Sequence, residues 1–194
     1  MNFSNVTWRG GGIEDIQLFT KLPAELAAVL KETNGFILHS GAFHLRGAVL
    51  TPEWHSLGAA LNGAHAFHRL YGSVLESDIP FGQDQLGDQF ILREGSIFRL
   101  VAETGEIEFI SHSLSQFLIA VAENIEAFLN VGLNHKLEPG QLLHAYPPFV
   151  TKEAAHGVSL KPCEATELIR FHAEIARQIA ELPDGTQISI KFTQ

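Results

Sequence analysis

The sequence contains a single cysteine, Cys163, and no long hydrophobic run. One cysteine excludes an intramolecular disulfide, which is typical of proteins from a reducing compartment. The longest uninterrupted apolar run, residues 117–122, is far shorter than the roughly 20 residues that a membrane-spanning helix requires. Residues 1–9 also lack the basic-then-apolar order of a signal peptide. We therefore expect a cytoplasmic protein that has no membrane partner.

Basic residues are also scarce, because 13 Lys and Arg stand against 22 Asp and Glu, for a net charge of −9. Binding to a phosphate backbone requires clustered Lys and Arg that displace counterions, so this balance argues against a nucleic-acid partner. It favours a basic protein partner. The alternative is that the acidic balance serves only solubility.

The length and composition predict an ordered protein. With 194 residues, 45% hydrophobic and 18% charged, the chain can bury a substantial core in a single domain. Residues 1–12 end in three consecutive glycines, and we expect this segment to be flexible, or strand-like only where it docks on the body. Residues 13–194 then form the single domain.

Two helices are predicted in the first 71 residues. The first begins at Pro23, which suits the first helical position, and ends at Asn34-Gly35. Leu22, Leu26 and Leu30 recur on one face at the helical period. The second covers residues 54–71 and is broken near Asn62-Gly63.

From residue 88 the apolar period changes from that of a helix to that of a strand. Residues 90–92, 97–101 and 107–110 are short apolar runs separated by glycine turns, and such short turns join antiparallel neighbours. A helix follows, with Ser113 as its N-cap, Gln116 three residues later and Gly132 as its stop.

The last third of the sequence predicts an irregular stretch, then a helix that starts near Pro162, then a strand over residues 187–192. His172 lies within the apolar stripe of this helix, so we expect a buried histidine that bonds to the backbone. The fold class is therefore α+β, a mainly antiparallel sheet of about five strands with helices packed against it.

Ten histidines raise the alternative of a metal-dependent hydrolase. His65 and His68 are spaced to share one face of a helix and could ligate one ion. However, no His-Glu-x-x-His or Cys-x-x-Cys spacing is present. We expect no metal, no cofactor and no catalytic residue, and hence a protein that is not an enzyme.

The densest acidic group in a predicted loop region consists of Glu76, Asp78, Asp84 and Asp88. One interpretation is a docking surface for a basic protein, because exposed charges steer association. The other is turn chemistry, because Asp and Gly are residues that loops use to form turns.

Three of these features occur in an order that resembles the SMI1/KNR4 superfamily (SUKH domains). They are the Leu22-Pro23 start and Asn34-Gly35 end of the first helix, the glycine-containing acidic turn over residues 79–92, and Ser113 with Phe117-Leu118 after the meander. The resemblance covers about residues 13–130, so residues 131–194 form a C-terminal extension.

The resemblance implies a function in protein binding. Many bacterial members are immunity proteins that bind and neutralise a toxin, and a basic toxin such as a nuclease would fit the acidic charge of this chain. Other members are regulatory proteins with cellular partners. We therefore expect an immunity protein that acts by steric and electrostatic blockade, with a cytosolic regulatory or scaffolding protein as the alternative. The sequence leaves the oligomeric state open.

Overall fold

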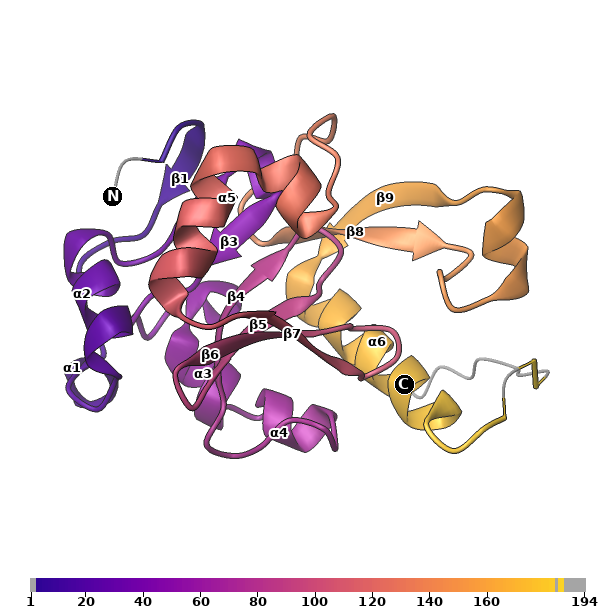
Figure 1. Cartoon of the computed structure of the whole chain (residues 1–194), viewed down its shortest axis with the longest axis horizontal. Helices are drawn as coiled ribbons and strands as arrows, with labels where there is room; N and C mark the ends of the chain where they lie inside the picture. The colour runs from indigo at the N-terminus through magenta and orange to yellow at the C-terminus, as the bar shows by residue number, and fades with distance from the viewer. Residues whose placement is uncertain (1–2, 184, 187–194) are drawn as a thin grey trace.

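The computed structural model describes residues 3–183 and 185–186, and its centre is a seven-stranded antiparallel sheet. The strands are paired in chain order, so the whole sheet is a meander (Figure 1). Its strands are β1 (Val6–Arg9), β2 (Phe36–Leu38), β3 (Phe43–Leu45), β4 (Ile79–Asp84), β5 (Gln89–Arg93), β6 (Ser96–Leu100) and β7 (Ile107–Ser111).

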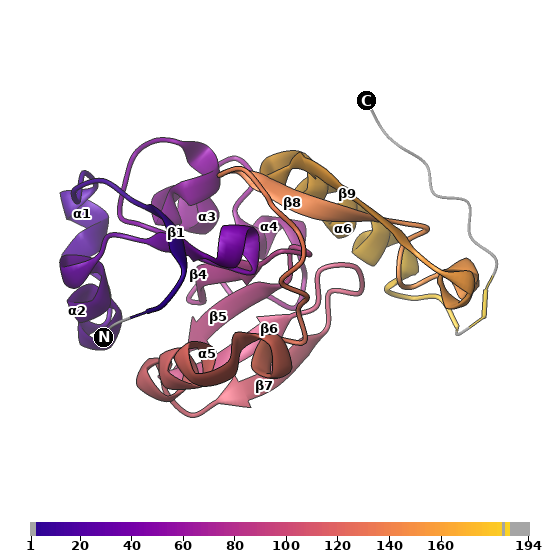
Figure 2. The same cartoon turned by 90° about the horizontal axis from the view of Figure 1, so that it is seen from above.

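Helices cover both faces of this sheet (Figure 2). Helix α5 (Leu114–Leu129), with α2 (Ala24–Glu32) beside it, packs on one face; α4 (Phe67–Leu70) and α6 (Ala165–Ile179) pack on the other. Consecutive strand residues point to opposite faces, so Phe90 lies in the first core and Ile91 in the second. Burial of both faces explains why β5 reads as a continuous apolar run.

The predicted centre of the fold is confirmed. Strands β5, β6 and β7 are sequential and antiparallel, and Glu94 and Gly95 form the first turn with positive φ angles of 51° and 84°. The Ser113 hydroxyl accepts a hydrogen bond from the Gln116 N–H at 3.2 Å, and α5 begins at the next residue. The helix ends at Asn130, in the left-handed region at φ 56°, and not at Gly132. Asn tolerates this conformation better than most residues.

The predicted number of strands was too low. The main sheet has seven strands instead of about five, because β2 and β3 contain three residues each and give little periodic signal. The predicted flexible segment 1–12 contains β1, whose Val6 pairs with Leu38 of β2. This segment is strand-like by docking, which was one of its two expected states.

The largest error lies in the C-terminal extension. The expected irregular stretch is wrong, because residues 141–164 contain a β-hairpin of β8 (Gln141–Tyr146) and β9 (Ser159–Glu164). The helix expected to start near Pro162 is α6, which begins at Ala165, after the hairpin. Proline is tolerated in β9 because this strand pairs on one side only. The hairpin projects beyond the main sheet (Figures 1 and 2). The expected strand over residues 187–192 lies outside the described residues.

Shorter helices connect these elements. The broken second helix is confirmed as α3 (Leu57–Asn62) and α4, which are separated at Gly63. The remaining helical turns are α1 (Ile16–Phe19), η1 (His39–Gly41), η2 (Glu53–His55) and η3 (Lys152–His156). Over the described ranges, every helix is too short or too polar to cross a bilayer.

Candidate functional site

The four acidic residues singled out in the sequence do not share one exposed surface. Glu76 is exposed, and Asp88 is half-buried. Asp78 and Asp84 are each only 2% exposed. Two of the four carboxylates therefore lie inside the folded protein and do not face a partner in this conformation.

Asp78 ties the segment before β4 to strand β5. Its Oδ2 accepts a hydrogen bond from the Leu75 N–H at 2.8 Å. The Arg93 guanidinium binds both carboxylate oxygens, at 2.8 Å from Nε and 2.6 Å from a terminal nitrogen. This is a two-pronged ion pair with one buried partner, and its role is structural.

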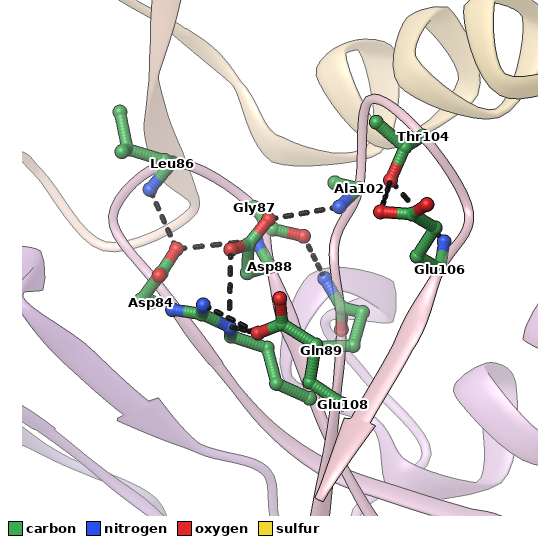
Figure 3. Close-up of polar contacts among 10 residues, drawn as sticks. Asp84, Leu86, Gly87, Asp88, Gln89, Ala102, Thr104, Glu106 and Glu108 are labelled. Atoms are coloured by element: carbon green, nitrogen blue, oxygen red, sulfur yellow. Dashed lines mark hydrogen bonds and ion pairs between the residues drawn. The ribbon is translucent and has the colours of Figure 1, made fainter. Parts of the chain in front are cut away.

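Asp84 organises the turn between β4 and β5 (Figure 3). Its Oδ1 accepts hydrogen bonds from the N–H groups of Leu86 at 2.8 Å and Asp88 at 3.1 Å, around Gly87 at φ 92°. Burial, with the Asp88 charge as a second cause, raises the pKa of the Asp84 carboxyl well above its usual range. These contacts fit the turn interpretation for Asp84.

A pocket of about 310 Å³ opens between the main sheet and the extension. The turn after β4, the turn after β6, strand β8 and helix α6 all contribute to its walls. Its polar lining consists of Asp88, Glu103, Thr104 and His172; its apolar lining consists of Leu86, Val101, Leu143, Ala145, Phe149 and Val150. It therefore combines apolar walls with two carboxylates.

Both carboxylates are positioned by backbone N–H groups. Asp88 Oδ1 accepts from the Ala102 N–H at 2.8 Å (Figure 3). Glu103 Oε2 accepts from the Val150 N–H at 2.9 Å, so it fixes the segment after β8 against the main sheet. Burial raises the pKa of both carboxyls, and these backbone hydrogen bonds oppose the increase.

His172 enters the pocket from α6 and is 2% exposed. The expected hydrogen bond to the backbone is wrong, because among the described residues neither ring nitrogen has a hydrogen-bond partner. Its Nε2 lies 3.9 Å from Glu103 Oε1, beyond hydrogen-bond distance. Burial, followed by the nearby His144, lowers the pKa of His172 to about 4. The imidazole is therefore neutral at pH 7.

This lowered pKa predicts a pH-dependent stability difference between the wild type and a His172→Leu variant. The unfolded histidine binds a proton near pH 6.5, but the folded one does so only near pH 4. Wild-type stability should therefore fall relative to the variant as the pH drops through this window, by about 3 kcal/mol in total. Urea unfolding of both proteins from pH 8 to pH 4 measures the difference. Curves that stay parallel below pH 6.5 would contradict it.

The structure does not place His65 and His68 on one helical face, as the metal alternative requires. His65 lies in the turn before α4, so it does not share a helical face with His68. Within residues 3–183 and 185–186, no group of three or more His, Cys, Asp and Glu side chains could hold a metal ion.

Glu103 and Phe149 line the pocket although the sequence did not indicate either as a site residue. Glu103 stood in a Glu-Thr-Gly-Glu stretch that predicted only a turn, and Phe149 stood beside two prolines in the expected irregular stretch. Neither position had a local signal, because the pocket joins segments that are 47 residues apart in the chain.

No protein-family model and no curated protein matches this chain. It is similar to a solved structure, Atu4351 from Agrobacterium tumefaciens, with a TM-score of 0.53 and 16% sequence identity. The match covers 88% of this chain and 85% of Atu4351. At this identity the similarity extends to the fold alone.

Proposed function

We propose that this protein is a non-enzymatic protein-binding module, an immunity protein that neutralises a basic toxin by covering its active site. The observation that carries the proposal is a pair of exposed aromatic side chains on the projecting hairpin. Tyr146, the last residue of β8, is 72% exposed, and Phe149, in the loop that follows, is 49% exposed. Aromatic side chains with this exposure are typical anchors of protein–protein interfaces.

The hairpin presents these side chains in a fixed position. Glu103 holds the Val150 N–H, and the Leu143 N–H donates to the Gln85 carbonyl at 2.7 Å. Both bonds tie the hairpin to turns of the main sheet. A surface that is ordered before binding loses less conformational entropy on association, which favours tight binding.

The acidic net charge of the protein supports the proposal that its partner is basic. The net charge of −9 raises the rate of encounter with a basic protein, most strongly at low salt. The resemblance to SMI1/KNR4 immunity proteins supplies the class of partner, a toxin whose basic substrate channel the hairpin and the acidic pocket beside it would cover. Blockade is then both steric and electrostatic.

Co-expression with the product of the adjacent gene, scored for growth, tests this proposal. Wild-type protein should restore growth, whereas Tyr146→Ala and Phe149→Ala should each weaken binding by about 2 kcal/mol, roughly 30-fold in Kd. Phe109→Ala is the matched control, because Phe109 is 50% exposed on β7, away from the hairpin.

Equal losses of binding affinity in Phe109→Ala and Phe149→Ala, or no loss in either hairpin variant, would show that the hairpin is not part of the interface. A wild-type protein that fails to restore growth against the adjacent gene product would contradict the immunity role. Hairpin-dependent binding to another cellular protein of known identity would then favour the regulatory or scaffolding alternative.

A further inference from the structure

We propose that the pocket lined by Asp88, Glu103 and His172 receives the guanidinium group of an arginine side chain of the protein partner. The inference rests on the proposed function and specifies its chemistry. Phe149 both lines this pocket and is half exposed beside it, so the pocket is continuous with the surface proposed to bind the partner.

Negative charge in the pocket exceeds the positive charge that faces it. Arg99 is the cation closest to Asp88, with Nε 3.9 Å from Oδ2. It is already bound by Glu108, at 3.0 Å from Nε and 2.6 Å from a terminal nitrogen. Among the described residues, no Lys or Arg forms an ion pair with Glu103. A cation from outside the chain would therefore complete the pocket.

His172 is the second, independent observation. A neutral imidazole carries one N–H donor and one acceptor nitrogen, and a buried polar atom is normally hydrogen-bonded. Both ring nitrogens of His172 lack a partner within the described residues, although the side chain lines the pocket. A ligand that donates hydrogen bonds could satisfy the acceptor nitrogen while it pairs with the carboxylates.

The shape of the pocket favours arginine over a metal ion or an ammonium. Its volume of about 310 Å³ is large for a bare ion, and its walls include Leu143 and Ala145, which suit an apolar side-chain stem. The three polar groups come from three different elements of the fold. A planar guanidinium has five N–H donors and can reach several acceptors at once, whereas an ammonium acts as a point charge.

The first test uses the isolated protein and a small probe. N-acetyl-arginine amide is titrated into isotope-labelled protein while the His172 ring resonances are followed, and N-acetyl-citrulline amide serves as the neutral comparator of the same shape. We expect a saturable shift with the arginine compound and none with the citrulline compound. No shift, or equal shifts with both compounds, would overturn the proposal.

Glu103→Gln is the variant of choice because it retains the oxygen that accepts the Val150 N–H. It should weaken binding of the arginine compound at least tenfold while the melting temperature holds or rises, since burial disfavours the charged carboxylate. A purely structural role for Glu103, which glutamine preserves by keeping this acceptor, predicts unchanged binding of the probe. Asp88→Asn, which retains the acceptor for the Ala102 N–H, provides a second variant if the first does not fold.

The second test separates the pocket from the proposed function. Partner binding that is weakened at least tenfold by Glu103→Gln supports an arginine from the partner. If the arginine compound binds but Glu103→Gln binds the partner like wild type, a free cation is the ligand and the inference is overturned, while the proposed function stands on the hairpin variants. If wild-type protein does not bind the adjacent gene product, the proposed function fails, and the probe titration still decides whether the pocket binds a guanidinium.

Discussion

Replacing Arg46 with methionine is expected to destabilise the folded protein severely. Arg46 follows β3 and is only 3% exposed. Its guanidinium donates to the Pro80 carbonyl at 2.9 Å, to Gln83 Oε1 at 2.6 Å and to Gln89 Oε1 at 2.7 Å. It also lies 5.2 Å from the centre of the Phe67 ring. Arg46 therefore joins β4, β5 and α4 from within the protein.

Methionine fills part of the same space but donates no hydrogen bond. The Pro80 carbonyl and Gln89 Oε1 would lose the donor that Arg46 supplies, and Gln83 Oε1 would keep only the 3.4 Å bond from Gln89 Nε2. Each lost hydrogen bond of this kind costs about 1–3 kcal/mol. We therefore expect the unfolding free energy to fall by about 3–9 kcal/mol, a large share of the roughly 5–15 kcal/mol typical of a folded domain. Denaturant unfolding monitored by tryptophan fluorescence measures this loss.

Two further variants make the test specific. Arg46→Lys keeps a positive charge but not the planar guanidinium, so it should recover only part of the stability that Arg46→Met loses. Arg69→Met is the surface control, because Arg69 is exposed and donates only to the Gly63 carbonyl among the contacts described. An Arg46→Met protein that unfolds within about 1 kcal/mol of the Arg69→Met protein would contradict this role for Arg46.

Burial lowers the pKa of Arg46 to about 9, so the side chain remains charged at pH 7. Its partners are carbonyl and amide oxygens, not carboxylates. The stabilisation from this cluster should therefore be insensitive to the protonation of acidic residues.

The parts of the fold that could be predicted are those specified within a few consecutive residues. The turn at Glu94-Gly95 needs positive φ angles, and the start of α5 needs the Ser113 hydroxyl beside the Gln116 N–H. Both signals depend on residues that are close in the chain. Strands β5, β6 and β7 and the start of α5 were therefore predicted almost to the residue.

The candidate site could not be predicted because it depends on contacts between distant segments. Glu103 accepts the hydrogen bond from the Val150 N–H only when the hairpin packs on the sheet. The second strand of that hairpin was not predicted because it contains Pro162, a residue that is uncommon in strands. For Asp78 and Asp84, the local pattern of acidic residues and glycine is the same in an exposed loop as in a buried turn. Tertiary packing, which the local pattern does not encode, decides between the two.

Replacing Asp78 with lysine is expected to show whether this residue has a buried structural role or is an exposed docking charge. Glu76→Lys, two residues away, is the matched control. The buried Asp78 carboxylate pairs with Arg93, so lysine would place a second cation beside that guanidinium and would leave the Leu75 N–H without its acceptor. We expect a loss of about 3–5 kcal/mol, the usual cost of breaking a buried ion pair.

Glu76 is exposed, and its reversal should change the unfolding free energy by no more than about 0.5 kcal/mol. Thermal and denaturant unfolding of both variants at pH 7 measure the difference in their stability. If Asp78 were instead an exposed docking charge, both variants would melt like wild type and both would slow association with a basic partner at low salt. Equal stability of the two proteins would support Asp78 as part of the binding surface, whereas a loss confined to Asp78→Lys assigns it to the ion pair that ties the segment before β4 to β5.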